Sequence, residues 1–260
     1  MQRAPDSHKG ENGKVAVIGG SLHQHGAPIF SALAAEASGV DLIFLALPNI
    51  HQEVSRMQSL NFQVHPFEKD ELSGADVQSL LEILATVDCA VIGPGLSRTP
   101  AAQRVIRELI ESATCPLVLD ASALQEWTVL AAKGKSAVLT PHLGELERMG
   151  VHPKTIGAVA KLSQLTIHVK GKIDHIAGPD GTVRNVAGGN AGLTVGGTGD
   201  ALAGLICGLI AQGMKPVEAS MTASKIIKRA GSVLFYEKSF AYTTREVIGQ
   251  IPHMLNTLCD

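Results

Sequence analysis

A glycine-rich loop followed by a single carboxylate is the stretch of this chain best suited to chemistry. Gly196, Gly197 and Gly199 let the backbone turn tightly and let an anion approach its amide groups. Residues 201–211 are apolar or small, which is typical of a buried helix whose unpaired first-turn amides and dipole attract phosphate. Asp200 stands at the junction, where a carboxylate either caps the helix or meets a substrate hydroxyl beside the anion. The spacing is not that of a P-loop or a Rossmann fingerprint.

Three further polar residues follow predicted strands, and each has two interpretations. Lys170 either reaches a nucleotide phosphate or extends its charged head into solvent. Asp120 either hydrogen-bonds a substrate or caps the helix after it. His142 either contacts a polar ligand or holds the turn that carries Glu145. The carboxyl ends of strands in an open α/β sheet line the ligand crevice, so these side chains are candidates for one site.

Glu145 and Asn190 also remain open between a structural and a functional role. Glu145 either helps to place Mg²⁺ through water or occupies the first turn of a helix. Asn190, just before the glycine-rich loop, either fixes the conformation of that loop or touches a ligand. The sequence assigns no metal ligands.

Short apolar runs alternate with helical patterns, which predicts a single α/β domain over residues 13–260 after a polar tail at residues 1–12. Buried parallel strands are expected where apolar and β-branched residues run into glycine, Asp or His. The expected strands span residues 14–20, 41–47, 60–64, 89–92, 116–119, 137–139, 165–169, 174–177 and 182–186, with the last two forming a hairpin. Helices are expected near residues 29–38, 74–86, 201–211, 217–235 and 244–258, and after Thr99.

The composition is that of a globular protein and excludes several classes of partner. Charged residues are 18% of the 260 and the formal net charge is −2, so nothing favours a nucleic acid or an anionic membrane. Aromatic residues are 3%, which argues against rows of stacked bases. Residues 1–12 lack the apolar core of a signal peptide and residues 201–211 are too few to cross a bilayer, so a cytoplasmic protein is expected. Widely spaced cysteines are expected to be reduced thiols: Cys89, Cys115, Cys207 and Cys259.

Several short motifs occur in a characteristic order along the chain. They are GPGL at 93–96, LVLDA at 117–121, TPHLGE at 140–145, KGKID at 170–174 and GGTGDALAG at 196–204, preceded by GGS at 19–21 and GA at 26–27. In this order they resemble the NAD(P)H-hydrate dehydratase family of the ribokinase-like superfamily, from roughly residue 13 to the last predicted helix. The resemblance implies a three-layer α/β/α sandwich with a mostly parallel central sheet.

The resemblance also implies a reaction, which is the repair of hydrated NADH and NADPH with ADP or ATP as phosphoryl donor and with Mg²⁺. Hydroxide leaves the hydrated nicotinamide ring poorly, whereas a phosphate ester leaves readily. Asp200 would deprotonate the substrate hydroxyl, and the amides of Gly197, Thr198 and Gly199 would stabilise the transferred phosphoryl group. The implied nucleotide-binding residues are Lys170, Gly171, Lys172, Ile173, Asp174 and Gly199. The implied substrate-binding residues are Ala27, Gly95, Asp120, His142, Asn190 and Asp200.

The chain departs from the family pattern at a few positions. His25 replaces the usual Tyr before the GA pair, and Ser97 replaces a glycine after GPGL, both on the substrate side. Residues 193–195 replace the usual Met-Ala followed by a small or basic residue, next to the nucleotide. Two alternatives therefore stay open: a kinase of a small alcohol such as a vitamin precursor or sugar, and a nucleotide-binding module without turnover.

The resemblance carries two expectations about partners. The family often joins this domain to an epimerase domain, which is not recognised in this sequence, so a separate NAD(P)H-hydrate epimerase is expected to work alongside it. The family also favours a homo-oligomer.

Overall fold

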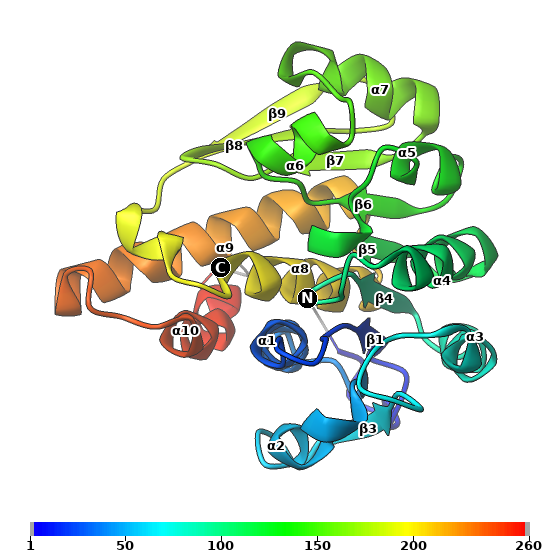
Figure 1. The fold of residues 1–260 in the computed structure, drawn as a ribbon. Coiled ribbons are helices and arrows are strands. Elements are labelled where there is room, and N and C mark those ends of the chain that lie inside the picture. Colours follow the sequence, from blue (N-terminus) through cyan, green and yellow to red (C-terminus); the bar gives the residue numbers. More distant parts are fainter. Residues whose placement is uncertain (1–2, 258–260) are drawn as a thin grey trace.

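A nine-stranded sheet forms the centre of the computed structural model, which describes residues 3–257 (Figure 1). The strands lie in the order β3-β2-β1-β4-β5-β6-β7-β8-β9. Neighbours from β3 to β7 are parallel, whereas β8 runs antiparallel to β7 and to β9, which confirms the predicted hairpin. The strands are β1 (Lys14–Ile18), β2 (Leu42–Leu47), β3 (Phe62–Pro66), β4 (Cys89–Ile92), β5 (Leu117–Leu119), β6 (Ala137–Leu139), β7 (Thr166–Val169), β8 (Ile173–Ala177) and β9 (Val183–Ala187).

Helices cover both faces of the sheet, which confirms the predicted three-layer α/β/α architecture (Figure 1). Because both faces are covered, strands such as β4, β5 and β6 are buried at every position. One face carries α1 (Gly26–Ala37), α8 (Thr198–Ala211), α9 (Pro216–Lys238) and α10 (Thr244–Asn256). The other carries α3 (Val77–Leu84), α4 (Pro100–Ser112), α5 (Thr128–Ala131), α6 (Leu143–Arg148) and α7 (Ile156–Ser163), while the short α2 (Gln52–Arg56) lies beside β3.

Alternate side chains of each strand enter different cores, as the period of a strand requires. In β1, Val15 and Val17 pack into the core with α8, whereas Ala16 and Ile18 pack into the core with α4. The strand order reverses at β1, whose two neighbours are β2 and β4. In open α/β sheets the crevice outside such a reversal is the usual ligand site.

Helices α1 and α8 approach each other closely because glycines replace side chains at their contact. A Cβ atom at Gly204 would overlap the Ser31 carbonyl, and one at Gly208 would overlap the Ser38 hydroxyl. The Ser31 hydroxyl also donates to the backbone carbonyl of Asp200 at 2.9 Å. The first turn of α8 is therefore fixed against α1.

Some local details differ from the sequence predictions. Helix α8 begins at Thr198 rather than at residue 201, because the glycine loop continues directly into helical turns. Helices α5 and α7 were not expected, since residues 128–131 and 156–163 are short and lack a strong helix start. Cys89, Cys115 and Cys207 are free and buried, whereas Cys259 lies outside the described residues. Across residues 3–257, no helix is long and apolar enough to span a membrane.

Candidate active site

Three parallel strands bring their polar end residues to one edge of the sheet. Asp120 follows β5, His142 lies just beyond β6, and Lys170 follows β7. The Lys170 amide donates to the Pro141 carbonyl at 2.8 Å, which ties the ends of β6 and β7 together. Gly93, at the end of β4, has a φ of +125°, and a Cβ atom there would overlap the Asp120 carbonyl. This close packing brings together the strand ends that the sequence predicted to form one site, through Pro141 and Lys170 and through Gly93 and Asp120.

Lys170 and Asp120 form an ion pair inside this edge. Lys170 Nζ lies 2.7 Å from Asp120 Oδ1 and 3.8 Å from Glu145 Oε2. Asp120 Oδ1 also accepts the Thr140 hydroxyl at 2.9 Å. Burial alone would lower the pKa of Lys170, but Asp120 and Glu145 outweigh it and raise that pKa, so the lysine stays charged.

These contacts revise two of the alternatives considered for the sequence. The Lys170 side chain is only 17% exposed, so its head does not simply extend into solvent. Asp120 occupies the N-cap position of a single 3₁₀ turn, Ala121–Ala123, but its side chain makes no capping hydrogen bond there. The carboxylate is bound to Lys170 and Thr140 instead, because an ammonium is a stronger partner than a backbone amide.

Asp200 lies in the first turn of α8, beside this charged cluster. The N-cap of that helix is Gly197, with φ of +96°, and within residues 3–257 the helix has no side-chain cap. The interpretation of Asp200 as the N-cap residue is therefore wrong. Burial raises the pKa of Asp200 to about 7, with Asp120 and Glu145 adding to the rise and Lys170 opposing it. A carboxyl group with this pKa can accept a proton near neutral pH, as a general base must.

The glycine loop in front of Asp200 packs against an aromatic ring. A Cβ atom at Gly197 would overlap the ring of Phe30 on α1, and the positive φ also excludes most other residues. The Thr198 hydroxyl donates to the Val195 carbonyl at 3.0 Å, and the Thr244 hydroxyl donates to the Gly196 carbonyl at 2.8 Å. Lys170 Nζ lies 3.4 Å from where a Cβ atom at Gly199 would stand. The loop, the helix N-terminus and the lysine thus lie close together, an arrangement suited to an anion.

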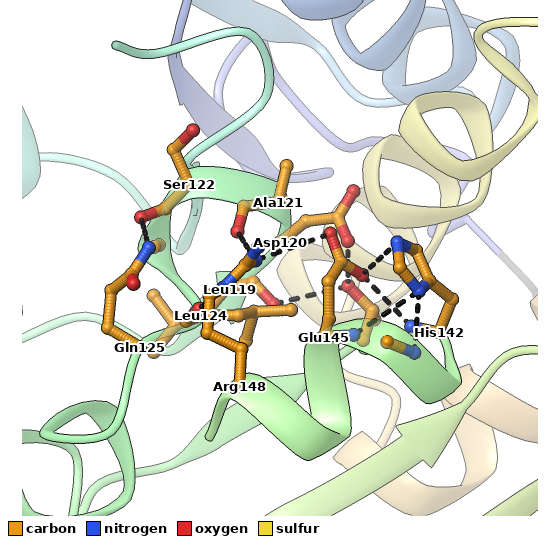
Figure 2. A network of polar contacts seen from close by, with 12 residues as sticks. Leu119, Asp120, Ala121, Ser122, Leu124, Gln125, His142, Glu145 and Arg148 are labelled. Atoms are coloured by element: carbon orange, nitrogen blue, oxygen red, sulfur yellow. Dashed lines mark hydrogen bonds and ion pairs between the residues drawn. The ribbon is translucent and has the colours of Figure 1, made fainter. Parts of the chain in front are cut away.

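His142 and Glu145 form a reciprocal cap at the start of α6 (Figure 2). His142 Nδ1 accepts the amides of Gly144 and Glu145 at 3.0 and 3.3 Å, and Glu145 Oε2 accepts the His142 amide at 2.9 Å. The turn-holding alternative for His142 and the first-turn alternative for Glu145 are both found. Nε2 of the exposed ring lies 3.6 Å from Glu145 Oε2, beyond hydrogen-bond distance, and is the ring nitrogen left to meet a ligand.

Arg148 supports the same turn from its other side and was not singled out from the sequence (Figure 2). Its guanidinium donates to the carbonyls of Leu124 at 2.9 Å and Ala121 at 3.1 Å, and it lies 3.8 Å from Glu145 Oε1. Ala121 has a φ of +50°, a conformation that is uncommon for a residue with a side chain. Arg148 thus holds the backbone immediately after Asp120, an effect that depends on contacts distant in sequence.

Asn190 uses its whole amide group to fix the loop. Its Oδ1 accepts the Gly192 amide at 2.9 Å and the Tyr242 hydroxyl at 2.7 Å, and its Nδ2 donates to the Gly231 carbonyl at 2.7 Å. Of the two alternatives, the geometry favours the structural one.

Asp174 anchors the segment implied to bind nucleotide. Its Oδ1 accepts the Gly171 amide at 2.8 Å, and its Oδ2 accepts the Ser224 hydroxyl at 2.6 Å and His168 Nε2 at 3.1 Å. Burial would raise the pKa of Asp174, but the hydrogen bonds from His168 and Ser224 outweigh it and lower that pKa to about 2. Asp174 is therefore buried and ionised, whereas Lys172 and Ile173 are exposed.

Two of the residues implied to line the substrate side follow β1 and β4: Ala27 lies in the first turn of α1, and Gly95 lies in the loop after β4. Gly95 has a φ of +71°, and a Cβ atom there would lie 3.3 Å from Ala27 Cβ. The Gly20 amide donates to the Pro94 carbonyl at 2.8 Å, which joins the two loops. The ring of His25 lies 5.2 Å from that of His51, between centroids. The structure thus brings Ala27 and Gly95 together and places His25 beside another imidazole.

The residues of the site do not form a metal cage of their own. Within residues 3–257, no group of three or more His, Cys, Asp or Glu side chains could hold a metal ion. Mg²⁺ usually takes one or two carboxylates together with substrate phosphates, so it does not require such a group of protein side chains.

Comparisons with a family model and with curated proteins agree on one family. A family model described as NAD(P)H-hydrate dehydratase matches residues 15–253. The chain is 35% identical to an ADP-dependent (S)-NAD(P)H-hydrate dehydratase of Cenarchaeum symbiosum, over 97% of this chain and 92% of the relative. It is 36% identical to the protein of the same name from Nitrosopumilus maritimus, over 96% and 90%. It is 32% identical to a bifunctional NAD(P)H-hydrate repair enzyme Nnr of Methanopyrus kandleri, over 98% of this chain but 51% of that protein.

Solved structures agree with the fold. An ADP/ATP-dependent NAD(P)H-hydrate dehydratase from Bacillus subtilis, co-crystallised with ATP and Mg²⁺, superposes with a TM-score of 0.84 at 26% identity, covering 98% of this chain and 93% of the other. Ribokinase from Thermotoga maritima superposes with a TM-score of 0.61 at 10% identity, over 94% and 99%. The second similarity shows that the fold is ribokinase-like.

Proposed function

We propose a function that follows from the family, since this chain belongs to the NAD(P)H-hydrate dehydratase family. The chain converts hydrated NADH and NADPH back to NADH and NADPH in a nucleotide-dependent dehydration. The observation that carries the proposal is the position of Asp200. Its carboxyl, with a pKa raised to about 7, lies in the first turn of a helix whose glycine-rich N-terminus is suited to phosphate.

The reaction uses phosphorylation to create a leaving group. Asp200 takes the proton of the ring hydroxyl, and the hydroxyl oxygen attacks the terminal phosphorus of the nucleotide, releasing AMP from ADP or ADP from ATP. The ring nitrogen then expels inorganic phosphate, and loss of a ring proton restores the double bond. The backbone around Gly197, Thr198 and Gly199 supports the charge on the phosphoryl group during transfer.

Two loops are proposed to hold the ligands. The nucleotide lies against residues 170–174 and Gly199. The hydrated dinucleotide lies between Ala27 and Gly95 on one side and His142 on the other. Lys170 and Asp120 form an ion pair, and we propose that this pair balances the charge next to Asp200. Lys170 also faces the phosphates, since its ammonium lies close to Gly199.

ADP is the donor that we propose first, since the relatives with 35% and 36% identity are both named as ADP-dependent. When bound with the nucleotide, Mg²⁺ supplies charge neutralisation of the phosphates. Asp120 and Glu145 would hold the ion through water rather than directly, because both carboxylates already bind protein groups.

The proposal is tested by following the recovery of NADH absorbance from purified (S)-hydrated NADH with ADP or ATP and Mg²⁺. Wild type should restore NADH, and Asp200→Asn should bind nucleotide normally while its turnover falls on the order of 10²-fold or more. Asp6→Asn, at an exposed carboxylate near the N-terminus, serves as the matched control and should keep full activity. Full activity of Asp200→Asn would refute the assignment of the base.

Two other results would replace the proposal. A stable phosphate ester formed from another small alcohol would make the chain a kinase, and His25 and Ser97 would be the first residues to change. Tight nucleotide binding without any phosphoryl transfer would make it a binding module.

We further propose that an NAD(P)H-hydrate epimerase works alongside this domain and supplies the (S) epimer, since the Methanopyrus kandleri relative is named as a bifunctional repair enzyme. Added epimerase should then speed the recovery of NADH from the (R) epimer, and equal rates with and without it would refute this.

We also propose that the protein forms a homo-oligomer and that it works in a reducing, cytoplasmic compartment. The exposed aromatic side chains Phe235, Tyr236 and Phe240 support a contact between copies, which light scattering tests. The buried free thiols Cys89, Cys115 and Cys207 support the compartment.

A further inference from the structure

The side chain of Lys228, on α9, lies between residues 171–174, in the segment proposed to hold the nucleotide, and Gly189, in the segment that leads to the glycine-rich loop. Its ammonium donates to the carbonyls of Gly171 at 2.9 Å and Lys172 at 3.2 Å, and lies 3.3 Å from Asp174 Oδ1. Its aliphatic stem packs against Gly189, where an added Cβ atom would lie 3.3 Å from Lys228 Cγ. The side chain is 10% exposed. One buried lysine thus touches both segments from a third part of the chain.

The hydrogen bond to Gly171 sets the direction of a peptide group. In a trans peptide the carbonyl and the following amide point in opposite directions, and no cis peptide occurs within residues 3–257. Because the Gly171 carbonyl points at Lys228, the Lys172 amide points away from it, toward the exposed side of the segment. Amides in such turns bind phosphate oxygens. Lys228 therefore determines how this amide is presented.

The second segment is fixed by the same face of α9. Ser224, Lys228 and Gly231 follow one another at helical spacing on that face. Ser224 binds Asp174, and the Gly231 carbonyl accepts Asn190 Nδ2 at 2.7 Å. A side chain at Gly231 would collide with Leu193, within 2.7 Å of its Cγ. This face of α9 thus sets the distance between residues 170–174 and the loop that leads to Asp200.

We infer that Lys228 is a positioning residue for the nucleotide donor, acting through the Gly171–Lys172 peptide and the spacing of the two segments. The inference rests on the proposed function for the identity of the donor. It predicts a loss of nucleotide affinity with the chemical step preserved, because Lys228 touches neither Asp200 nor the loop at Gly197.

The test compares Lys228→Met with Lys228→Arg and with Lys225→Met, a matched control at an exposed lysine of the same helix. Calorimetry measures the Kd of ADP with Mg²⁺, and kinetics separate KM for ADP from kcat. Lys228→Met should weaken ADP binding and raise KM for ADP at least tenfold, with kcat at saturating ADP and KM for the hydrated dinucleotide within about threefold. Lys228→Arg should recover most of the affinity, since a guanidinium also donates to carbonyls.

Wild-type ADP affinity in a folded Lys228→Met, or a fall in kcat with KM for ADP unchanged, would overturn the inference. If Lys228→Met does not fold, Lys228→Gln decides, because its shorter amide keeps a polar side chain at the site but cannot reach both carbonyls that the ammonium binds. A Kd for ADP raised at least threefold in Lys228→Gln supports the inference, and an unchanged Kd overturns it. Calorimetry with ADP needs no hydrated substrate, so it tests the inference separately from the proposed function. If ADP binding depends on Lys228 but the protein does not restore NADH, the proposed function is refuted and the inference stands.

Discussion

Lys170 Nζ lies 2.7 Å from Asp120 Oδ1, and this one ammonium balances several carboxylates at the end of the sheet. Glu145 Oε2 is 3.8 Å away, and Asp200 adds its own charge to the same cluster. Burial is the main cause that raises the pKa of Asp200 to about 7, and the negative charges of Asp120 and Glu145 add to it while Lys170 opposes it. The charges of the ion pair thus help to set the protonation of the proposed base.

Removing the Lys170 charge should therefore shift the pH dependence of turnover. In Lys170→Met the attraction that opposes the rise is lost, so the apparent pKa of the base should move upward from about 7 and turnover at pH 7 should fall. Breaking this mostly buried pair should also destabilise the protein by about 3–5 kcal/mol. The pH profile of kcat, together with denaturant unfolding, measures both effects.

Lys133→Met is the control for Lys170→Met, since Lys133 is exposed and its loss should change neither quantity. A Lys170→Met enzyme whose pH profile matches that of wild type would show that Asp200 titrates independently of the ion pair.

Ionised Asp200 should lower the free energy of unfolding at the neutral and alkaline pH at which it can act as a base. Its pKa in the folded protein is about 7, against an ordinary value of 3.8, so between these pH values the folded state keeps a proton that the unfolded state has lost. Its stabilising contribution is complete below pH 3.8 and is lost as the pH rises through about 7. Asp200→Asn should thus be more stable than wild type at pH 8, on the order of 2 kcal/mol after allowance for solvent.

The difference in unfolding free energy between wild type and Asp200→Asn, measured from pH 4 to pH 8, isolates this effect from other titrating groups. A difference that stays constant across that range would mean that the pKa of Asp200 is close to its ordinary value.

The sequence predicted the sheet, the glycine loop and the order of the polar strand ends, because each has a local signature. Apolar runs ending in Asp120, His142 or Lys170 are visible without any knowledge of the fold. The partners of these residues are not, since an ion pair between Lys170 and Asp120 joins positions 50 residues apart. The interpretation of Asp200 as a cap failed for a local reason, which is that Gly197 starts the helix earlier than the apolar run suggests.

Residues that only position others left no pattern in the sequence. Lys228 lies in a helix with other lysines, and its burial follows from the packing of α9 on residues 171–174 and on Gly189. Arg148 and Tyr242 act in the same way, through backbone carbonyls or an amide far along the chain. Long-range hydrogen bonds of this kind require the fold before they can be recognised.

Asn190→Ala should behave as a structural variant. The substitution removes three hydrogen bonds, which join the start of the loop to Gly192, Tyr242 and Gly231, and we expect a loss of about 2–4 kcal/mol in unfolding free energy. KM for the hydrated dinucleotide should change less than kcat, because the amide does not face the ligand. Thermal unfolding and steady-state kinetics check this.

Tyr242→Phe is the matched partner of that variant, since it removes only the bond to Asn190 Oδ1. Its effect should be smaller and in the same direction. A large rise in KM for the hydrated dinucleotide in Asn190→Ala, with stability unchanged, would restore Asn190 to the substrate site.

Gly197→Ala should nearly abolish turnover, while it should lower the stability of the fold only moderately. The φ of +96° strains any residue with a side chain, and the added methyl group would overlap the ring of Phe30. Phe30 or the loop must therefore move, and a displaced loop carries the amides and Asp200 with it, so a loss of activity of at least 10²-fold is expected from misplaced groups. The melting temperature should fall by several degrees, as for a loss of about 1–3 kcal/mol.

Gly196→Ala tests whether the effect belongs to position 197 rather than to the loop in general. Gly196 is exposed, has no positive φ and has no atom within 4 Å of an added Cβ, so this variant should keep the melting temperature of wild type. Adding Phe30→Ala to Gly197→Ala separates the two causes further. Recovery of activity in the double variant would assign the loss to the collision with the ring, and continued inactivity would assign it to the backbone conformation.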